Sequence, residues 1–482
     1  MKNPTQIIEL SAKALSIEIH KKGISCSEVM AAYLHQIDSL NDQVNAIVSL
    51  QNIDELIWQA KLMDLELAEG KSRGWMHGFP LAPKDLTATK GIPTTFGASY
   101  LKKNVMSQDS ILVERMRASG AILIGKTNVP EFGLGSHTYN DLFGTTLNAF
   151  DLSKSAGGSS GGAAVALALN FLPVADGSDM GGSLRNPAAW NNVYGFRPSC
   201  GRVPFGPTSE VFYEQLGTEG PMARNVPDLA MLLSVQAGYD VRAPLCLSEN
   251  PEIFTQRLEK NFKRTRVGWM GDLNSYLPME AGIMDLYEKA LPYFETMGCT
   301  VAETHPRFDM AKLWKCWLNL RAFLVAGKLK PFYKDPNKRQ FMKPEAIWEF
   351  EQGSSLTAME VYEASEVRSA WAMELNRLFE TYDYLVLPAT QIFPFEAHEH
   401  WPKEINGKPM DTYHRWMEVV IGATLAGLPT LSVPAGFNSE GLPLGLQIIG
   451  KPRQDLSVLQ FGYAWQCATP FSEVRSPLLR QG

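Results

Sequence analysis

Residues 157–185 read GGSSGGAAVALALNFLPVADGSDMGGSLR, and this stretch decides the fold class. Its middle, GGAAVALALNF, has the composition of a buried helix, and FLPVADGSD is a short apolar run that ends in a polar, glycine-rich turn. Continuous apolar runs of this kind suit strands that are buried on both faces of a sheet. A buried helix that leads directly into a buried strand indicates layers of helices packed around a sheet.

The same alternation continues on both sides of this stretch. GFPLAPKD at 78–85 and AILIGKTN at 121–128 are further candidate strands, with the helical segment SILVERMRAS between them. TRVGWMG at 265–271, a helix over 285–298 and CTVAE at 299–303 predict a βαβ-like unit, which either extends the same sheet or begins a second lobe. YLVLPAT, PTLSVPAG and GLQIIG return to strand-like sequence near the end of the chain. The sequence therefore predicts an α/β fold with a central mixed, largely parallel sheet that helices cover on both faces.

The predicted organisation is a single domain over residues 1–482, with three internal regions. Residues 1–70 read as helices, with a capping box at Ser25 and Glu28 and a glycine stop at Gly70. Residues 75–205 carry the candidate catalytic core. Residues 310–380 read as helical and aromatic-rich, and we expect them to lie over the active site.

Composition excludes several classes of partner. The net charge is -6, and no Lys/Arg block is present, so neither nucleic acid nor an acidic membrane surface is expected as a partner. No run of about 18 apolar residues appears, and the start of the chain lacks the apolar core of a signal peptide. The six cysteines are scattered without a CxxC pair, which predicts reduced thiols in a cytoplasmic protein. The oligomeric state cannot be derived from composition, and a homodimer is compatible with it.

Two short motifs resemble known sites, and their surroundings speak against both. Gly120 to Thr127 matches the phosphate-loop pattern GxxxxGK[ST], but the four intervening residues are Ala, Ile, Leu and Ile, which favour a buried strand. Gly157 to Gly161 matches the nucleophile elbow GxSxG, but a polar loop precedes it where an elbow needs a strand. No histidine is placed by the sequence to act as the base of a Ser-His-Asp triad.

Three other segments combine into a candidate catalytic site. Taken singly, Lys84 is best explained as a strand-end lysine and Ser183 as part of a helix-capping turn. Taken together, Lys84, Ser159 and Ser183 offer a nucleophile, a base and a glycine loop whose N–H groups can bind an oxyanion. Serine–lysine systems of this kind need no histidine, and a buried lysine can lose its proton near neutral pH.

These segments resemble the amidase signature family. The resemblance rests on PLAPKD, GKTNVPEFG (125–133), FGTTLNA (143–149), GGSSGG, GSDMGGS and the pair GLPTLSVPAG and GLPLGLQIIG over 427–450. It covers nearly the whole chain and is strongest over residues 75–205. These motifs are too long and too specific for chance agreement.

The resemblance implies a role for each matched residue. Ser183 is the expected nucleophile, Ser159 the bridging serine with a cis peptide bond before it, and Lys84 the base. Ser160 is expected to support the loop, and Asp179 and Arg185 to pin it. The remaining implied residues are the oxyanion-hole N–H groups of Met180, Gly181, Gly182 and Ser183, and the substrate-binding residues Gly133, Leu134 and Ser136.

The implied activity is hydrolysis of a carboxylic amide-type C–N bond through an acyl-enzyme, with no metal or organic cofactor. The aromatic side chains between 314 and 416 either pack the core or form a funnel for apolar or aryl substrates. An amide, an anilide or a carbamate (urethane) would fit such a funnel, and esterase activity is expected as a side reaction. One alternative is the catalytic subunit of a glutamine-dependent amidotransferase complex. The other is a binding scaffold without catalysis, which the presence of all three catalytic residues disfavours.

Overall fold

The computed structural model describes residues 3–480 of the chain. Its N-terminal part is helical, as predicted, with four helices before residue 70: α1 (Pro4–Ile8), α2 (Ala12–His20), α3 (Cys26–Val44) and α4 (Ile53–Ala68). The capping box is confirmed, because Ser25 Oγ accepts the Glu28 N–H and a Glu28 carboxylate oxygen accepts the Ser25 N–H. Gly70 ends the second long helix with φ of 79°.

The core of the described chain is an eight-stranded sheet. Its strands, in spatial order, are β5 (Ala175–Asp179), β7 (Thr218–Ala223), β6 (Tyr194–Arg197), β13 (Thr430–Phe437), β14 (Pro443–Ile449), β10 (Tyr384–Pro388), β8 (Arg266–Trp269) and β9 (Thr300–Glu303).

The predicted mixed sheet is confirmed, but its expected largely parallel character is wrong. Only the β10–β8 and β8–β9 pairings are parallel, and the other pairings of this sheet are antiparallel. The reason lies in the connections. Strands β13 and β14 are joined by a turn over residues 438–442, which is far too short for the crossover that a parallel pair requires. The unit at 265–303 forms the parallel edge and belongs to the same sheet.

Helices lie on both faces of this sheet. Gly445 of β14 faces Ala189 of α7 (Arg185–Trp190), whereas Leu431 of β13 faces Gly462 of α16 (Asp455–Ala468). Gly445 also lies against Ser432, the neighbour of Leu431, and successive strand residues point to opposite faces. Helix α6 (Gly161–Ala168) packs beside α7, and α8 (Val226–Gln236) packs beside α16. The predicted covering of both faces is therefore confirmed.

The strand prediction for residues 78–128 is only partly correct. The structure has two-residue strands there, β2 (Pro80–Leu81) paired with β3 (Ile122–Leu123), and β4 (Lys126–Thr127) paired with β1 (Ile47–Val48), all outside the large sheet. Proline has no N–H for a ladder, so Pro80 and Pro83 prevent a longer strand before Lys84. The intervening helix α5 (Ile111–Ala118) forms as predicted.

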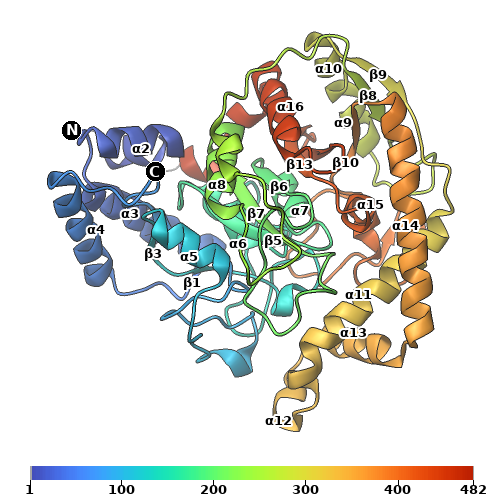
Figure 1. Ribbon diagram of the computed structural model, residues 1–482, viewed down its shortest axis with the longest axis horizontal. Coiled ribbons are helices and arrows are strands. Elements are labelled where there is room, and N and C mark those ends of the chain that lie inside the picture. Colours follow the sequence, from blue (N-terminus) through green and yellow to red (C-terminus); the bar gives the residue numbers. More distant parts are fainter. Residues whose placement is uncertain (1–2, 481–482) are drawn as a thin grey trace.

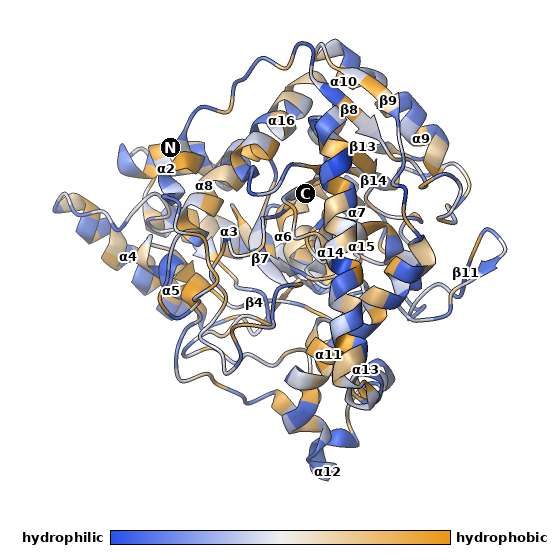
Figure 2. Cartoon of the chain, turned by 45° about the vertical axis from the view of Figure 1, so that its right-hand side comes forward, coloured by the Kyte–Doolittle hydropathy of each residue, from blue (hydrophilic) through white to orange (hydrophobic). Residues whose placement is uncertain are grey.

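The remaining helices line one side of the molecule. In Figure 1 helices α2 to α5 lie on the left, and the long helices α11 and α14 lie on the right, where α11 packs against both α13 and α14. Figure 2 shows α14 with alternating polar and apolar stretches, as expected for a helix with one covered face. The remaining bounds are α9 (Ile283–Ala290), α10 (Pro292–Thr296), α11 (Met310–Tyr333), α12 (Pro336–Arg339), α13 (Pro344–Ser355), α14 (Ala358–Thr381), α15 (Ile421–Leu425), β11 (Glu404–Ile405) and β12 (Lys408–Pro409). Within residues 3–480, none of the helices combines the length and the hydropathy that a membrane crossing requires.

Candidate active site

The three candidate catalytic residues come from three different connections. Lys84 follows β2, Ser159 lies just before α6, and Ser183 lies in the loop between β5 and α7. The fold brings these connections together at the end of the edge strand β5. Ser159 and Ser183 line one cavity, and Lys84 lies directly behind Ser159.

Lys84 is completely buried, and its amino group is surrounded by hydroxyl groups. Its Nζ lies 2.8 Å from Ser159 Oγ, 2.8 Å from Ser160 Oγ and 3.0 Å from Ser178 Oγ. Burial lowers the pKa of Lys84 to about 7, although the nearby carboxylates Asp176 and Asp179 act to raise it. At neutral pH a large share of this lysine is therefore an uncharged amine, which is the state that a general base requires.

The two serines of the site are held by the backbone around them. The Gly158–Ser159 peptide bond is cis, as the family resemblance implied. Ser160 N donates to the Ser183 carbonyl oxygen at 3.2 Å, so the two serine segments are tied to each other. Ser183 is 8% exposed and lines the cavity, and its hydroxyl forms no hydrogen bond to another residue in the range 3–480. The hydrogen bond between Ser183 and Ser159 that a proton relay needs is therefore not formed in this structure. Such catalytic hydrogen bonds commonly form only when a substrate is bound.

The loop after β5 presents backbone N–H groups beside Ser183. Across the described part of the chain, the N–H groups of Met180, Gly181 and Ser183 have no acceptor. Gly182 differs from the expectation, because its N–H donates to Asp179 Oδ1 at 3.0 Å. Gly182 adopts φ of 87°, and a Cβ there would lie 2.7 Å from the side chain of Asn186. Its role in this structure is to shape the loop, which leaves three N–H groups as candidate oxyanion donors.

A buried ion pair fixes this loop, as predicted for Asp179 and Arg185. Asp179 accepts from Arg185 at 2.8 Å and from the Leu184 N–H at 3.1 Å, and both side chains are fully buried. Arg197 of β6 donates to the carbonyl oxygen of Asp179. Burial alone would raise the pKa of Asp179, but Arg185 and Arg197 hold it well below its usual range. The carboxylate therefore stays charged across the pH range of the folded protein.

The three predicted substrate-binding residues have different positions. Gly133 and Leu134 line the cavity, and a Cβ on Gly133 would lie 3.3 Å from Ser159 Oγ. Ser136 is wrongly predicted as a substrate contact, because it is buried and does not line the cavity. Its hydroxyl donates to the Gly158 carbonyl oxygen at 2.5 Å and so supports the peptide bond before Ser159.

The cavity beside Ser183 has a volume of about 410 Å³ and mainly apolar walls. Of the aromatic residues that the sequence singled out between 314 and 416, only Phe332 of α11 is among its lining residues. Trp314, Trp317 and Trp371 are buried in the core instead. The other apolar side chains of the wall are Leu86, Phe96, Phe132, Leu134, Met180, Phe205, Val325, Leu329 and Met417.

Sequence reasoning missed three polar residues of the site. Ser178 of β5 contacts Lys84, and Glu219 of β7 lies opposite Ser178 in the sheet register and lines the cavity. Asp176 accepts the Lys84 N–H at 3.2 Å and was also missed. The signal was present in the sequence, because each of these polar residues interrupts an otherwise buried strand.

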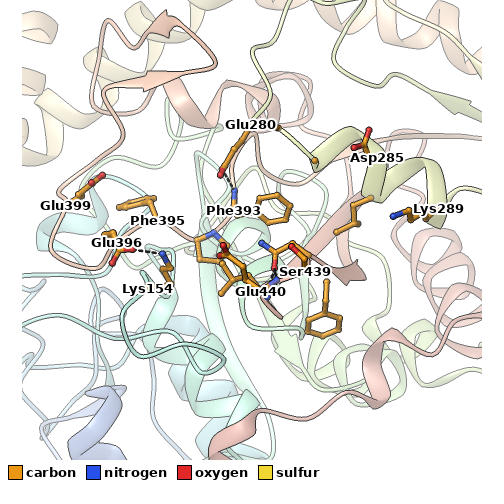
Figure 3. Close-up of a pocket in the computed structure, with 17 residues that line it drawn as sticks. Lys154, Glu280, Asp285, Lys289, Phe393, Phe395, Glu396, Glu399, Ser439 and Glu440 are labelled. Atoms are coloured by element: carbon orange, nitrogen blue, oxygen red, sulfur yellow. Dashed lines mark hydrogen bonds and ion pairs between the residues drawn. The ribbon is translucent and has the colours of Figure 1, made fainter.

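A second cavity of about 580 Å³ lies elsewhere and contains none of the three catalytic residues. Figure 3 shows acidic side chains around it, including Glu280, Asp285 and Glu440, and an ion pair between Lys154 and Glu396. Although this cavity is larger, the chemistry described above is confined to the cavity beside Ser183.

Neither of the two rejected motifs forms the site that its pattern suggests. The segment 120–127 contributes strands β3 and β4, and Lys126 Nζ donates to Thr87 and Thr89 at 2.6 and 2.7 Å. No helix of α type directly follows it, since residues 131–133 form a short 3-10 turn. Ser159 lies between a loop and α6, with Lys84 rather than a histidine at its hydroxyl group.

Comparisons with known proteins identify the family of this chain. A family model described as Amidase matches residues 28–459. An acylamidase of Rhodococcus erythropolis is 29% identical over 96% of both chains, and a glutamyl-tRNA(Gln) amidotransferase subunit of Symbiobacterium thermophilum is 33% identical over 98% of this chain and 99% of its own. A solved structure of a bacterial aryl acylamidase of the amidase signature family superposes with a TM-score of 0.90 at 29% identity, covering 97% of this chain and 98% of that one. The chain belongs to the amidase signature family of amide hydrolases.

Proposed function

We propose that this protein hydrolyses the C–N bond of aryl amides, anilides or aryl carbamates through an acyl-enzyme on Ser183. The observation that carries the proposal is the fully buried Lys84 amine, 2.8 Å from Ser159 Oγ, beside a mainly apolar cavity that Ser183 lines. The likeness to an acylamidase and to a structure of an aryl acylamidase supports the same bond class.

The first half of the reaction forms the acyl-enzyme. As substrate binds, Ser183 Oγ turns toward Ser159 and attacks the carbonyl carbon. Its proton passes to Ser159 Oγ, and the Ser159 proton passes to the neutral Lys84 amine. The carbonyl oxygen becomes negative and accepts hydrogen bonds from the N–H groups of Met180, Gly181 and Ser183. Each such donor lowers the barrier by ~3–4 kcal/mol in comparable hydrolases.

The second half releases both products. The protonated Lys84 returns its proton through Ser159 to the leaving nitrogen, so that the C–N bond breaks to give a neutral amine. A water molecule then attacks the acyl carbon and gives its proton to the same relay. Ser183 leaves with that proton, and the carboxylic acid is released. A carbamate follows the same path: the amine leaves first, and water then releases the alkoxycarbonyl group from Ser183 as a carbonic acid half-ester, which breaks down to an alcohol and carbon dioxide.

The walls of the cavity favour apolar substrates. The ring centroid of Phe132 lies 6.0 Å from that of Phe96 and 5.0 Å from that of Phe332. An aryl group bound beside them gains both buried area and ring contacts. Ester cleavage is expected as a side activity, because a good leaving group needs no protonation by Ser159.

The second candidate function is participation in an amidotransferase complex. Relatives with 30–33% identity over nearly the full chain are named as subunits of glutamyl-tRNA(Gln) amidotransferase. The test is to assay the purified chain on glutamine, an aliphatic amide, an anilide, an aryl ester and an aryl carbamate, first alone without ATP and then with the other subunits of a glutamyl-tRNA(Gln) amidotransferase. Turnover of the anilide or carbamate supports the proposal. Activity on glutamine alone, or only with a partner present, supports the amidotransferase.

A covalent probe tests the nucleophile separately. A fluorophosphonate or an aryl sulfonyl fluoride should label Ser183, and peptide mapping should find the adduct there. A binding scaffold without catalysis would remain unlabelled.

The six cysteines are all unpaired in the structure, which supports our proposal that the protein works in a reducing compartment such as the cytoplasm.

A further inference from the structure

Glu219 is an acidic residue in an otherwise uncharged, buried strand. It lies in β7, whose six residues are all buried, and it pairs across the sheet with Ser178 of β5. Directly opposite residues of an antiparallel pair have neighbouring side chains on one face of the sheet. Ser178 Oγ also contacts Lys84 Nζ at 3.0 Å, so Ser178 is a neighbour of both Glu219 and the proposed base.

The carboxyl group of Glu219 accepts and donates no hydrogen bond within the described residues 3–480. Glu219 is 5% exposed and belongs to the wall of the cavity beside Ser183. Its Oε2 atom is buried and has no hydrogen bond to any residue between 3 and 480. A buried polar atom without a partner is unfavourable, and in a binding cavity the missing partner is commonly the ligand.

The other charged groups of this cavity are already engaged. Glu214 forms an ion pair with Lys328 and accepts the Gly217 N–H at 2.9 Å. Arg321 donates to Glu349 and to the Tyr413 hydroxyl at 2.6 Å each. Among the charged residues that line this cavity in the described structure, Glu219 is the one without such a contact.

The surroundings favour the protonated form of Glu219. Burial raises its pKa to about 8, and the carboxylate of Asp176 in β5 acts in the same direction. Lys84 behind the strand and Lys328 of α11 oppose this shift. Lys84 is itself partly uncharged at neutral pH, and Lys328 is held by Glu214. A carboxylic acid that keeps its proton is a hydrogen-bond donor as well as an acceptor.

We propose that Glu219 is a specificity-determining residue whose protonated carboxyl group donates a hydrogen bond to a neutral oxygen acceptor of the substrate, such as an ether or a second carbonyl. This inference rests on the proposed function and names a substrate class within it. The favoured substrates are those with such an oxygen beyond the scissile bond, in place of a plain hydrocarbon chain. An ionised Glu219 would recruit cations instead, but it would also raise the pKa of Lys84 and so lower the share of neutral amine at neutral pH.

The test compares isosteric compounds in binding, with no need for turnover. Three pairs place the oxygen at different positions. In the acyl chain, N-phenylpentanamide is compared with 2-ethoxy-N-phenylacetamide and with 3-methoxy-N-phenylpropanamide. On the ring, N-(4-ethylphenyl)acetamide is compared with N-(4-methoxyphenyl)acetamide. Dissociation constants are measured by calorimetry at pH 6.5 on the full chain carrying Ser183→Ala, which prevents acylation. Glu219, Glu219→Gln and Glu219→Leu are compared in that background.

We expect at least one pair to bind with an ether preference of roughly three- to tenfold, the worth of one hydrogen bond. Glu219→Gln should keep the preference, because its amide group still donates, and Glu219→Leu should abolish it. The matched control is Glu214→Gln. Glu214 is a carboxylate of the same cavity that has no proton to donate, so its replacement should leave the ratio of dissociation constants within each pair unchanged. Equal ratios for Glu219 and Glu219→Leu in all three pairs would overturn the inference.

A pH series adds a readout that a merely structural role would not move. With Glu219 the ether preference should disappear between pH 7 and pH 9.5, because the donor proton is lost as the pH rises through its pKa. With Glu219→Gln, which does not titrate, the preference should stay constant. A preference that persists at pH 9.5 with Glu219 present would contradict the protonated donor. The failure of the proposed function looks different, since the protein with Ser183 would then cleave none of these anilides while the binding ratios remained.

Discussion

The acid limb of the activity profile follows directly from the burial of Lys84. The mechanism requires its neutral amine, and burial places its pKa at about 7. With that pKa, about 90% of the amine is neutral at pH 8 and about 1% at pH 5. We therefore expect kcat/KM for an anilide to fall close to a hundredfold between pH 8 and pH 5, with a slope of one decade per pH unit at the acid end.

The assay must separate this titration from acid unfolding. Initial rates from pH 5 to pH 9 are measured together with far-UV circular dichroism, so that only pH values with intact structure are used. The loop that carries Ser183 should survive this range, because Arg185 and Arg197 keep the Asp179 carboxylate ionised. Lys84→Met should remove the activity at every pH. A rate that stays flat from pH 8 to pH 5 in folded protein would refute a lysine base.

Four further predictions concern single residues around this base. Ser183→Ala should reduce turnover of an anilide by more than about 10⁴-fold while the melting temperature stays unchanged, and retained activity would exclude Ser183 as the nucleophile. Ser178→Ala removes one hydroxyl from the Lys84 amine, so kcat should fall by about tenfold at constant KM; a change in KM alone would assign Ser178 to substrate binding. Gly133→Ala places a Cβ 2.7 Å from Leu86 at φ of 71°, which should cost ~1–2 kcal/mol in the free energy of unfolding and lower kcat, as urea titration and kinetics would show. Asp179→Ala leaves two buried arginines without their carboxylate, so the free energy of unfolding should drop by about 3–5 kcal/mol; a drop below 1 kcal/mol in urea titration would show that water enters the site.

The sequence was sufficient for the parts of the site that depend on rare residue patterns. Lys84, Ser159 and Ser183 lie in glycine- and proline-rich segments next to the ends of short helices and strands, and the structure brings the three segments together. The capping box at Ser25 is likewise a local pattern with a local outcome. Such features depend on neighbours in the chain, and these neighbours are visible in the sequence.

The parts that failed depend on partners far along the chain. The orientation of the sheet strands depends on which strand lies beside which. Because helices cover both faces of this sheet, its antiparallel strands also read as apolar runs, a pattern that is otherwise typical of parallel sheets. Gly182 was expected to donate to substrate, but Asp179 uses its N–H group. Ser136 is close in sequence to Gly133 and Leu134, which line the cavity, but its hydroxyl group donates to the Gly158 carbonyl oxygen instead. Glu219 became visible as a cavity residue only when β7 was placed beside β5.

The anchoring of Arg185 has a consequence for how this enzyme can be divided. Its guanidinium group donates to the Val420 carbonyl oxygen, to Thr424 Oγ1 and to Gln447 Oε1, all more than 230 residues further along the chain. A fragment that ends after residue 205 would contain every reacting group and still lack the surface against which the nucleophile loop is set. The candidate catalytic core, residues 75–205, is therefore not expected to function when it is moved to another scaffold. Grafting it onto another scaffold, or separating it from the C-terminal segment that begins at Val420, would give an inert product until the missing strands were supplied.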